Sequence, residues 1–230
     1  MKFKRASLSP EQLNLHDQLY TGPVARENML GSAIRRYELD LLVSVYKAVR
    51  PRRSIEWGLG TGISAVALGK ARQDLGLPGK HVTLDPLQSH FANRGVECIE
   101  ENGALDCVDF HPVTSEEYLV QARQRGETFD FVFIDGAHDV GQKLTDACLT
   151  SGVLSPGAIV CFHDSFFTST SLALSYLVEH CGLELHETGD EVPLRRRLRG
   201  IKHARRLGLR YALRYAPRID YALSVLQKRN

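Results

Sequence analysis

The sequence predicts a doubly wound α/β fold, in which helices cover both faces of a mostly parallel sheet. Short runs rich in β-branched and aromatic residues alternate with helix-length amphipathic segments between Arg53 and His186. Turn-forming pairs such as Pro78-Gly79 and Asn102-Gly103 punctuate this alternation, and a glycine-rich turn follows its first strand. A chain of 230 residues, of which 43% are hydrophobic, is long enough to bury a single core without disulfides or a structural metal.

The alternation defines six strands and six helices. The first helix is expected between Ser32, a candidate N-cap, and Pro51, because apolar residues recur there at near-helical spacing. The expected strands are Ser54–Trp57, His81–Leu84, Val108–His111, Phe129–Ile134, Ala158–Phe162 and Leu183–His186. Further helices are expected near residues 62–75, 88–102, 115–125, 139–152 and 168–181.

Charge divides the chain into two parts. Residues 1–190 carry 17 basic and 25 acidic residues, whereas residues 191–230 carry 12 basic and 2 acidic residues. This asymmetry predicts an acidic globular domain over residues 1–190 and a basic appendage over residues 191–230. Basic residues recur every three or four positions between Arg199 and Arg218, which is typical of one side of a helix, so a basic amphipathic helical tail is expected.

The sequence favours a cytoplasmic protein. No apolar run approaches the roughly 18 residues of a membrane span, and a polar stretch rather than a signal core follows the first basic residues. The five cysteines form no C-x-x-C pair, which argues against a thiolate metal site. The tail resembles an interfacial helix, so residues 195–218 are expected to contact an anionic membrane peripherally. RNA, the acidic domain of a second copy, or solvent alone are the alternatives.

The turn after the first strand has the pattern E-x-G-x-G-x-G over residues 56–62. A dinucleotide fingerprint would place its third glycine at position 63, where this chain has Ile63. The pattern resembles the first motif of the class I S-adenosylmethionine-dependent methyltransferases. A carboxylate at Glu56 suits the cofactor of that family, which has an ammonium and a sulfonium group, and would repel a pyrophosphate.

The resemblance implies a Rossmann-like methyltransferase fold and a set of cofactor contacts. In that family the motif surrounds the methionine part of the cofactor, an acid after the second strand accepts the ribose hydroxyls, and the loop after the third strand contacts adenine. The implied contacts in this chain are Glu56, Gly58, Gly60, Gly62, Ser64, Asp85, Ser115 and Asp135. Without the resemblance, Asp85 and Ser115 fit equally well as a turn residue and a helix cap.

Titratable residues follow the fourth and fifth strands. Asp135 and His138 come after the fourth strand, and His163 and Asp164 end the fifth. Because parallel strands end at one edge of a sheet, these four residues are expected to converge near the glycine turn. Both segments resemble the methyltransferases that act on hydroxyls of small molecules and sugars, which often hold a divalent metal there.

That resemblance implies a metal site at Asp135, His163 and Asp164, with Mg²⁺ or Mn²⁺ as the expected ion. The family usually has a carboxylate at the position of His163. An imidazole shifts the preference from Mg²⁺ toward Mn²⁺, Fe²⁺ or Zn²⁺, or indicates that no metal binds. Without a metal, His138 or His163 is the expected general base, because imidazole titrates near neutral pH.

The predicted function is S-adenosylmethionine-dependent O-methylation of a small molecule or a sugar-like hydroxyl. The expected partners are a small-molecule or glycan acceptor, an anionic membrane at residues 195–218, and further copies of the chain, whereas nucleic acid is not expected. A nicotinamide-dependent oxidoreductase is the alternative within enzymes, and Ile63 and the lack of a Tyr-x-x-x-Lys pair disfavour it. A non-enzymatic RNA-binding module using the arginine-rich tail is the third hypothesis.

Overall fold

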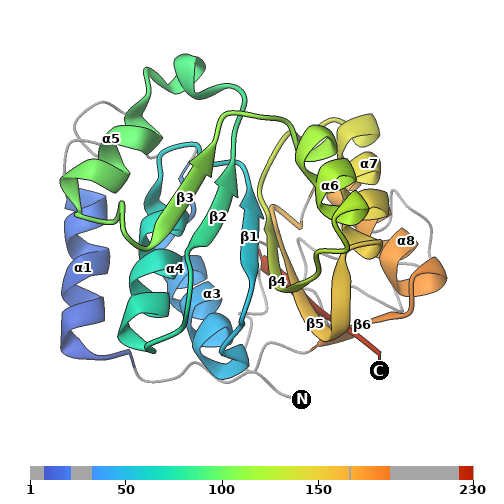
Figure 1. Ribbon diagram of the computed structural model, residues 1–230, viewed down its shortest axis with the longest axis horizontal. Coiled ribbons are helices and arrows are strands. Elements are labelled where there is room, and N and C mark those ends of the chain that lie inside the picture. Colours follow the sequence, from blue (N-terminus) through green and yellow to red (C-terminus); the bar gives the residue numbers. More distant parts are fainter. Residues whose placement is uncertain (1–7, 22–32, 166, 187–222, 230) are drawn as a thin grey trace. The chain divides into compact units, whose positions relative to one another are not determined.

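All six predicted strands are present in the computed structural model, which describes residues 8–21, 33–165, 167–186 and 223–229 (Figure 1). Five of them have the predicted bounds. The chain forms two compact units, Arg5–Ser115 and Glu116–Asn230. Both units repeat the alternation of strand and helix that the sequence predicts.

The Arg5–Ser115 unit has three parallel strands in the order β3-β2-β1. Its strands are β1 (Ser54–Trp57), β2 (His81–Leu84) and β3 (Val108–His111). Its helices are α1 (Pro10–Thr21), α3 (Arg36–Val49), α4 (Ile63–Asp74), η2 (Gln88–Phe91) and α5 (Arg94–Glu101). Helix α4 is buried on most sides because it packs against β2 and β3 and also against α1, α3 and α5.

The Glu116–Asn230 unit has four strands in the order β4-β5-β7-β6. The strands are β4 (Phe129–Ile134), β5 (Leu154–His163), β6 (Leu183–His186) and β7 (Leu223–Lys228). Strands β4 and β5 are parallel, whereas β7 runs antiparallel to both β5 and β6. The helices are α6 (Ser115–Gln124), which begins at the junction of the units, α7 (Val140–Ser151) and α8 (Thr168–His180), and α7 packs against α8.

Two predicted elements have different bounds in the structure. The helix expected over residues 88–102 is divided into η2 and α5, because Ala92 and Asn93 both have left-handed backbone conformations. The fifth strand begins at Leu154 rather than Ala158, and Pro156-Gly157, expected as a breaker, lies within it. The register with β4 shifts at this point, which accommodates the extra residues as an irregularity.

Two elements were not predicted. Helix α1 buries Gln12 and His16 beside Leu19, so polar residues on its buried side weaken the hydrophobic pattern. Strand β7 occupies residues that the sequence assigns to the end of the helical tail, and that part of the prediction is wrong. Residues 191–222 and Ser32 lie outside the described residues. The N-cap of α3 is Arg35, so the prediction that Ser32 caps this helix is wrong. No described helix is long and apolar enough to cross a bilayer.

Candidate active site

The glycine turn of the Arg5–Ser115 unit joins β1 to α4. Gly62, the N-cap of α4, has φ +81°, and a Cβ there would lie 2.6 Å from the carbonyl oxygen of Gly95. Gly60 has φ +49°, but a Cβ built on it would meet no atom within 4 Å. Both positions favour glycine for their backbone conformation, while only Gly60 borders open space. Gly58 continues the strand pairing, because its N–H donates to the carbonyl oxygen of Leu84 at 2.8 Å.

Asp85 follows β2 and holds the turn from the other side. Its Oδ2 accepts hydrogen bonds from the backbone N–H of Gly60 at 2.9 Å and from Nε2 of Gln88 at 2.7 Å. Its Oδ1 accepts from the N–H of Leu87 at 2.8 Å. A carboxylate has about four lone-pair positions, so these three bonds leave capacity for one further donor such as a ribose hydroxyl.

Gln88 is a site residue that the sequence analysis missed. Its Nε2 also donates to the carbonyl oxygen of Gly60 at 3.1 Å, and its Oε1 accepts from the N–H of Gly95 at 3.1 Å. The side chain is nearly buried, so these bonds are shielded from water. One amide thereby connects Asp85, the glycine turn and α5. The position of a glutamine three residues after the acid was the available signal.

Glu56 lies in β1 with its carboxylate fully buried. Its Oε1 accepts a hydrogen bond from the hydroxyl of Thr83 at 2.9 Å, and its Oε2 is 3.4 Å from Nε2 of His81. In this conformation, a ligand at the glycine turn would therefore interact with the charge of Glu56 by long-range electrostatic attraction and not by direct contact. Two serines were also predicted as cofactor contacts, and both are largely buried. Ser64 lies in the first turn of α4 and Ser115 lies at the start of α6.

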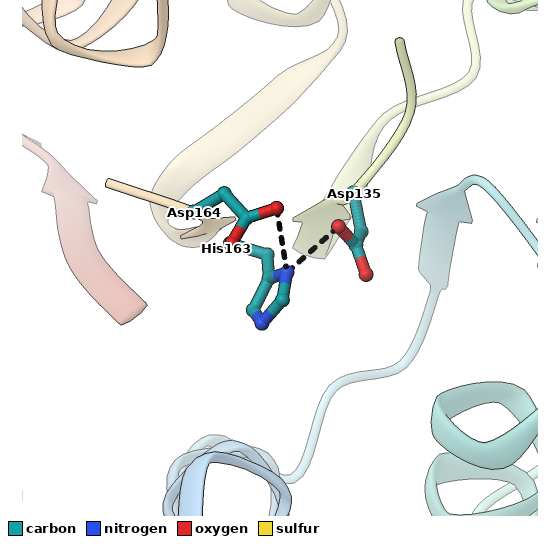
Figure 2. A group of neighbouring side chains, drawn as sticks. All are labelled: Asp135, His163 and Asp164. Atoms are coloured by element: carbon teal, nitrogen blue, oxygen red, sulfur yellow. Dashed lines mark hydrogen bonds and ion pairs between the residues drawn. The ribbon is translucent and has the colours of Figure 1, made fainter. Parts of the chain in front are cut away.

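Three side chains that could ligate a metal meet in the Glu116–Asn230 unit, where β4 and β5 end (Figure 2). Nδ1 of His163 lies 2.9 Å from Oδ1 of Asp135 and 3.5 Å from Oδ2 of Asp164. The side chain of His163 is 8% exposed and those of the two aspartates are 18% and 19% exposed, so the cluster is partly accessible to solvent. Asp164 has φ +52°, a left-handed backbone conformation that non-glycine residues rarely adopt.

His138 joins this cluster from the loop between β4 and α7. Its Nε2 is 3.4 Å from Oδ2 of Asp164, and its ring stacks on Phe167 with centroids 4.8 Å apart. Asp164 thus contacts both histidines. Burial lowers the pKa of His138, the charge of Lys143 lowers it further, and the nearby carboxylates only partly offset these effects. Sequence reasoning missed Phe167, which follows the fifth strand closely enough to have been considered.

Lys143 is a third residue that the sequence analysis missed. It lies on α7, fully buried, and its Nζ donates to the carbonyl oxygen of Gly136 at 3.4 Å. Burial lowers the pKa of Lys143, although the charges of Asp135 and Asp146 oppose that shift.

The pKa of Asp164 is lowered. Burial raises this pKa, but the hydrogen bond and charge of His163 and the charge of His138 outweigh the effect of burial.

The Asp135, His163 and Asp164 cluster fits a divalent metal ion. Donor atoms bound at about 2.1 Å lie about 3 Å apart when adjacent and about 4 Å apart when opposite. The three donor atoms here all lie within 4.8 Å of one another, so a small adjustment would bring them around one ion. Two carboxylates and one imidazole favour Mn²⁺, Fe²⁺ or Zn²⁺ over Mg²⁺.

The structure therefore places the predicted residues in two groups. Asp135, His138, His163 and Asp164 lie together, as expected for residues that follow neighbouring parallel strands. In the other unit, Asp85 contacts the glycine turn directly. That these two groups serve one ligand stays a prediction.

Part of the chain matches a known family. Residues 55–165, which include every cofactor-binding, metal-binding and catalytic residue predicted from the sequence, match the family model described as a methyltransferase domain. No curated protein matches the sequence. The match with the family model includes the glycine turn, Asp85 and the ends of β4 and β5.

Solved structures show the same fold. The O-methyltransferase TomG from Streptomyces achromogenes, solved with SAM, aligns with a TM-score of 0.58 at 18% identity, covering 97% of this chain and 92% of that one. An O-methyltransferase from Bacillus cereus, solved with SAH, aligns with a TM-score of 0.64 at 15% identity, covering 96% and 93%. The predicted fold class, a mostly parallel Rossmann-like methyltransferase fold, is confirmed.

Proposed function

Because residues 55–165 are a methyltransferase domain, we propose that this protein is an enzyme that transfers the methyl group of S-adenosylmethionine to a hydroxyl of a small molecule or glycan. The observation that carries the proposal is the open space at Gly60 beside Asp85. Gly60 leaves room for a ligand, and Asp85 retains an acceptor position for its hydroxyls. TomG and the Bacillus cereus enzyme are both described as O-methyltransferases, which supports an oxygen acceptor.

The reaction asks for alignment and for removal of one proton. A methyl group moves from the sulfonium sulfur to the acceptor oxygen, and the hydroxyl proton must leave that oxygen. His138 is the proposed base. Its Nε2 faces Asp164. With the proton of the neutral ring on Nε2, Nδ1 would accept the hydroxyl proton and the carboxylate would stabilise the resulting imidazolium.

The aspartates and His163 have a second proposed role. Asp135, His163 and Asp164 would hold a divalent ion, and such an ion supplies positive charge that stabilises a developing oxyanion. His163 has to lose the proton that it shares with Asp135 before its Nδ1 can coordinate a metal. Phe167 offers an apolar ring beside His138, against which the body of an acceptor would pack.

The test of this function is formation of S-adenosylhomocysteine during incubation with S-adenosylmethionine and panels of hydroxyl-bearing small molecules and glycans. Mass spectrometry should find an acceptor that has gained one CH₂. His138→Gln should lower turnover of that acceptor by about 10² to 10³ while cofactor affinity stays within twofold. His180→Gln, on the exposed end of α8, is the matched control and should keep full turnover.

A turnover by His138→Gln equal to that of the wild type would remove this residue from the mechanism. If S-adenosylhomocysteine forms only with the acceptor, but the methyl group is found on an atom other than the acceptor oxygen, the O-methylation proposal is contradicted. Transfer of hydride with a nicotinamide cofactor would overturn the methyltransferase function itself.

We also propose that residues 195–218 bring the enzyme to anionic membranes, because residues 191–230 carry 12 basic and 2 acidic residues. Arg206, Arg210 and Arg214 changed together to Gln in the full chain should reduce cosedimentation with phosphatidylserine vesicles. Changing the exposed Arg52, Lys80 and Arg125 to Gln is the charge-matched control. Equal loss in both variants would indicate nonspecific attraction, and salt-dependent binding of RNA instead of vesicles would favour nucleic acid.

A further inference from the structure

A set of buried polar side chains lies beside the glycine turn, within the Arg5–Ser115 unit. Ser54 and Glu56 alternate along β1, so they face the same side of the sheet, and Glu56 pairs in register with Thr83 of β2. His81 and Thr83 alternate along β2 in the same way. Each member of the set is at most 1% exposed: Tyr46, Ser54, Glu56, Arg72, His81 and Thr83.

Hydrogen bonds connect a buried cation to His81. Nη1 of Arg72 donates to the hydroxyl of Tyr46 at 3.2 Å and lies 3.4 Å from the hydroxyl of Ser54. The two hydroxyl oxygens are 2.8 Å apart, and Oγ of Ser54 is 2.9 Å from Nδ1 of His81. Arginine only donates, so the chain has a fixed donor at one end.

The other end of the chain is Glu56. Its Oε2 is 3.4 Å from Nε2 of His81, and both atoms are buried without another hydrogen-bond partner. If the proton of His81 were on Nδ1, two lone pairs would face each other in the core, which is costly. A proton on Nε2 gives each of these atoms a partner and lets Nδ1 accept the hydrogen of Ser54.

We propose that His81 is a positioning residue of the cofactor site. It carries its proton on Nε2 and so holds the Glu56 carboxylate two residues before Gly58. The donors then run in one direction, from Arg72 through the hydroxyls and His81 to Glu56. The held charge favours a ligand with sulfonium and ammonium groups at the turn. This inference rests on the proposed function, because it takes S-adenosylmethionine as the ligand of the cofactor site.

A pair of variants separates the two nitrogens of His81. In His81→Gln, the amide NH₂ takes the place of Nε2 and keeps a donor for Glu56. In His81→Asn, the shorter amide reaches only the place of Nδ1, so it accepts from Ser54 but leaves Oε2 without a donor. Calorimetry with S-adenosylmethionine should find affinity within about twofold for His81→Gln and about tenfold weaker for His81→Asn.

Thermal unfolding distinguishes this role from a purely structural one. Both variants remove an aromatic ring from the core, so both should lose stability, while only His81→Asn should lose affinity. Equal affinities in two folded variants would overturn the proposal. If the wild-type protein does not bind S-adenosylmethionine, the proposed function fails instead.

Nuclear magnetic resonance tests the proton position without any ligand. In ¹⁵N-histidine-labelled protein, the His81 signals are those that disappear in His81→Gln. We expect Nε2 to carry the proton and Nδ1 to carry none. A proton on Nδ1, or on both nitrogens, would overturn the proposal even if the affinities behave as expected.

Discussion

Oδ2 of Asp85 accepts a hydrogen bond from the backbone N–H of Gly60 at 2.9 Å. The two residues are separated by 25 positions, and the bond joins the end of β2 to the turn after β1. Gly60 is also the turn glycine beside which an added Cβ would meet no atom within 4 Å. The bond therefore fixes the backbone at the place where a ligand has room to approach.

Gly60→Val should abolish binding of S-adenosylhomocysteine, because the side chain would fill that open space. The substitution also strains a backbone at φ +49°. Gly76→Val is the matched control, because Gly76 has φ +62°, has equally open surroundings and follows α4 at its far end. It should cost similar stability and keep binding, as measured by calorimetry and thermal unfolding. Binding by Gly60→Val would place the ligand elsewhere.

Gln88→Leu should weaken S-adenosylhomocysteine binding by about tenfold, because it removes the amide that connects Asp85 to Gly60 and Gly95. Leu has a similar volume, so the core should remain filled. Calorimetry gives the affinity, and Gln73→Leu on the exposed side of α4 is the control. Unchanged affinity would show that Asp85 needs only its two backbone donors.

Mn²⁺ should bind at Asp135, His163 and Asp164, with electron paramagnetic resonance reporting the loss of free ion. Asp135→Asn should weaken this binding at least tenfold, because an amide is a poorer ligand than a carboxylate. Asp130→Asn, in the strand that precedes Asp135, is the control, since its Oδ1 still accepts from Ser155. The metal hypothesis fails if both variants bind Mn²⁺ as the wild type does, or if none binds.

The free energy of unfolding should fall at acidic pH, in part because Asp40 becomes protonated. Burial raises the pKa of Asp40, but the hydrogen bonds and charges of His16 and Arg36 outweigh it, so this pKa lies below its usual 3.8. The folded state thus binds the proton less tightly than the unfolded state. Asp40 therefore contributes stability above its unfolded pKa, and this contribution is lost as the pH falls through its folded pKa.

Asp40→Asn should flatten that dependence. Urea unfolding at about pH 7 and about pH 3 should show a smaller loss of free energy in the variant than in the wild type. Asp106→Asn, at an exposed position, should leave the loss unchanged. An identical loss in wild type and Asp40→Asn would show that other carboxylates control acid unfolding.

Much of the fold was predictable because local patterns and tertiary packing agree in the strands. Apart from Asp130, Phe129–Ile134 is apolar on both faces and is followed by an acid, which is typical of a buried parallel strand. Helix α1 was missed because Gln12 and His16 are buried through hydrogen bonds to Asp74 and Asp40. Hydrophobic periodicity does not register such polar contacts between helices.

Strand β7 was missed for another reason. Its antiparallel pairing with β5 joins residues such as Val160 and Leu226, far apart in the sequence, so no local signal specifies it. The neighbouring basic residues favoured a helix instead. A deletion of residues 195–230 would remove this strand, which is why the membrane test uses substitutions in the full chain.

The candidate site was predictable where a residue type directly follows a strand. Asp85, Asp135 and Asp164 have this position, and His163 is the last residue of β5. Gln88, Lys143 and His81 were not identified, because their roles depend on contacts that no spacing rule describes. Glu56 was chosen for its charge, whereas its complete burial follows from the packing around β1 and β2.

Calorimetric titration with S-adenosylmethionine, S-adenosylhomocysteine and NADH, each with and without a chelator, tests the central claim most directly. We predict micromolar binding of the first two ligands, no heat with NADH, and loss of binding in Gly60→Val but not in Gly76→Val. Binding of NADH, or no binding of any of the three, would contradict a methyltransferase site at the glycine turn.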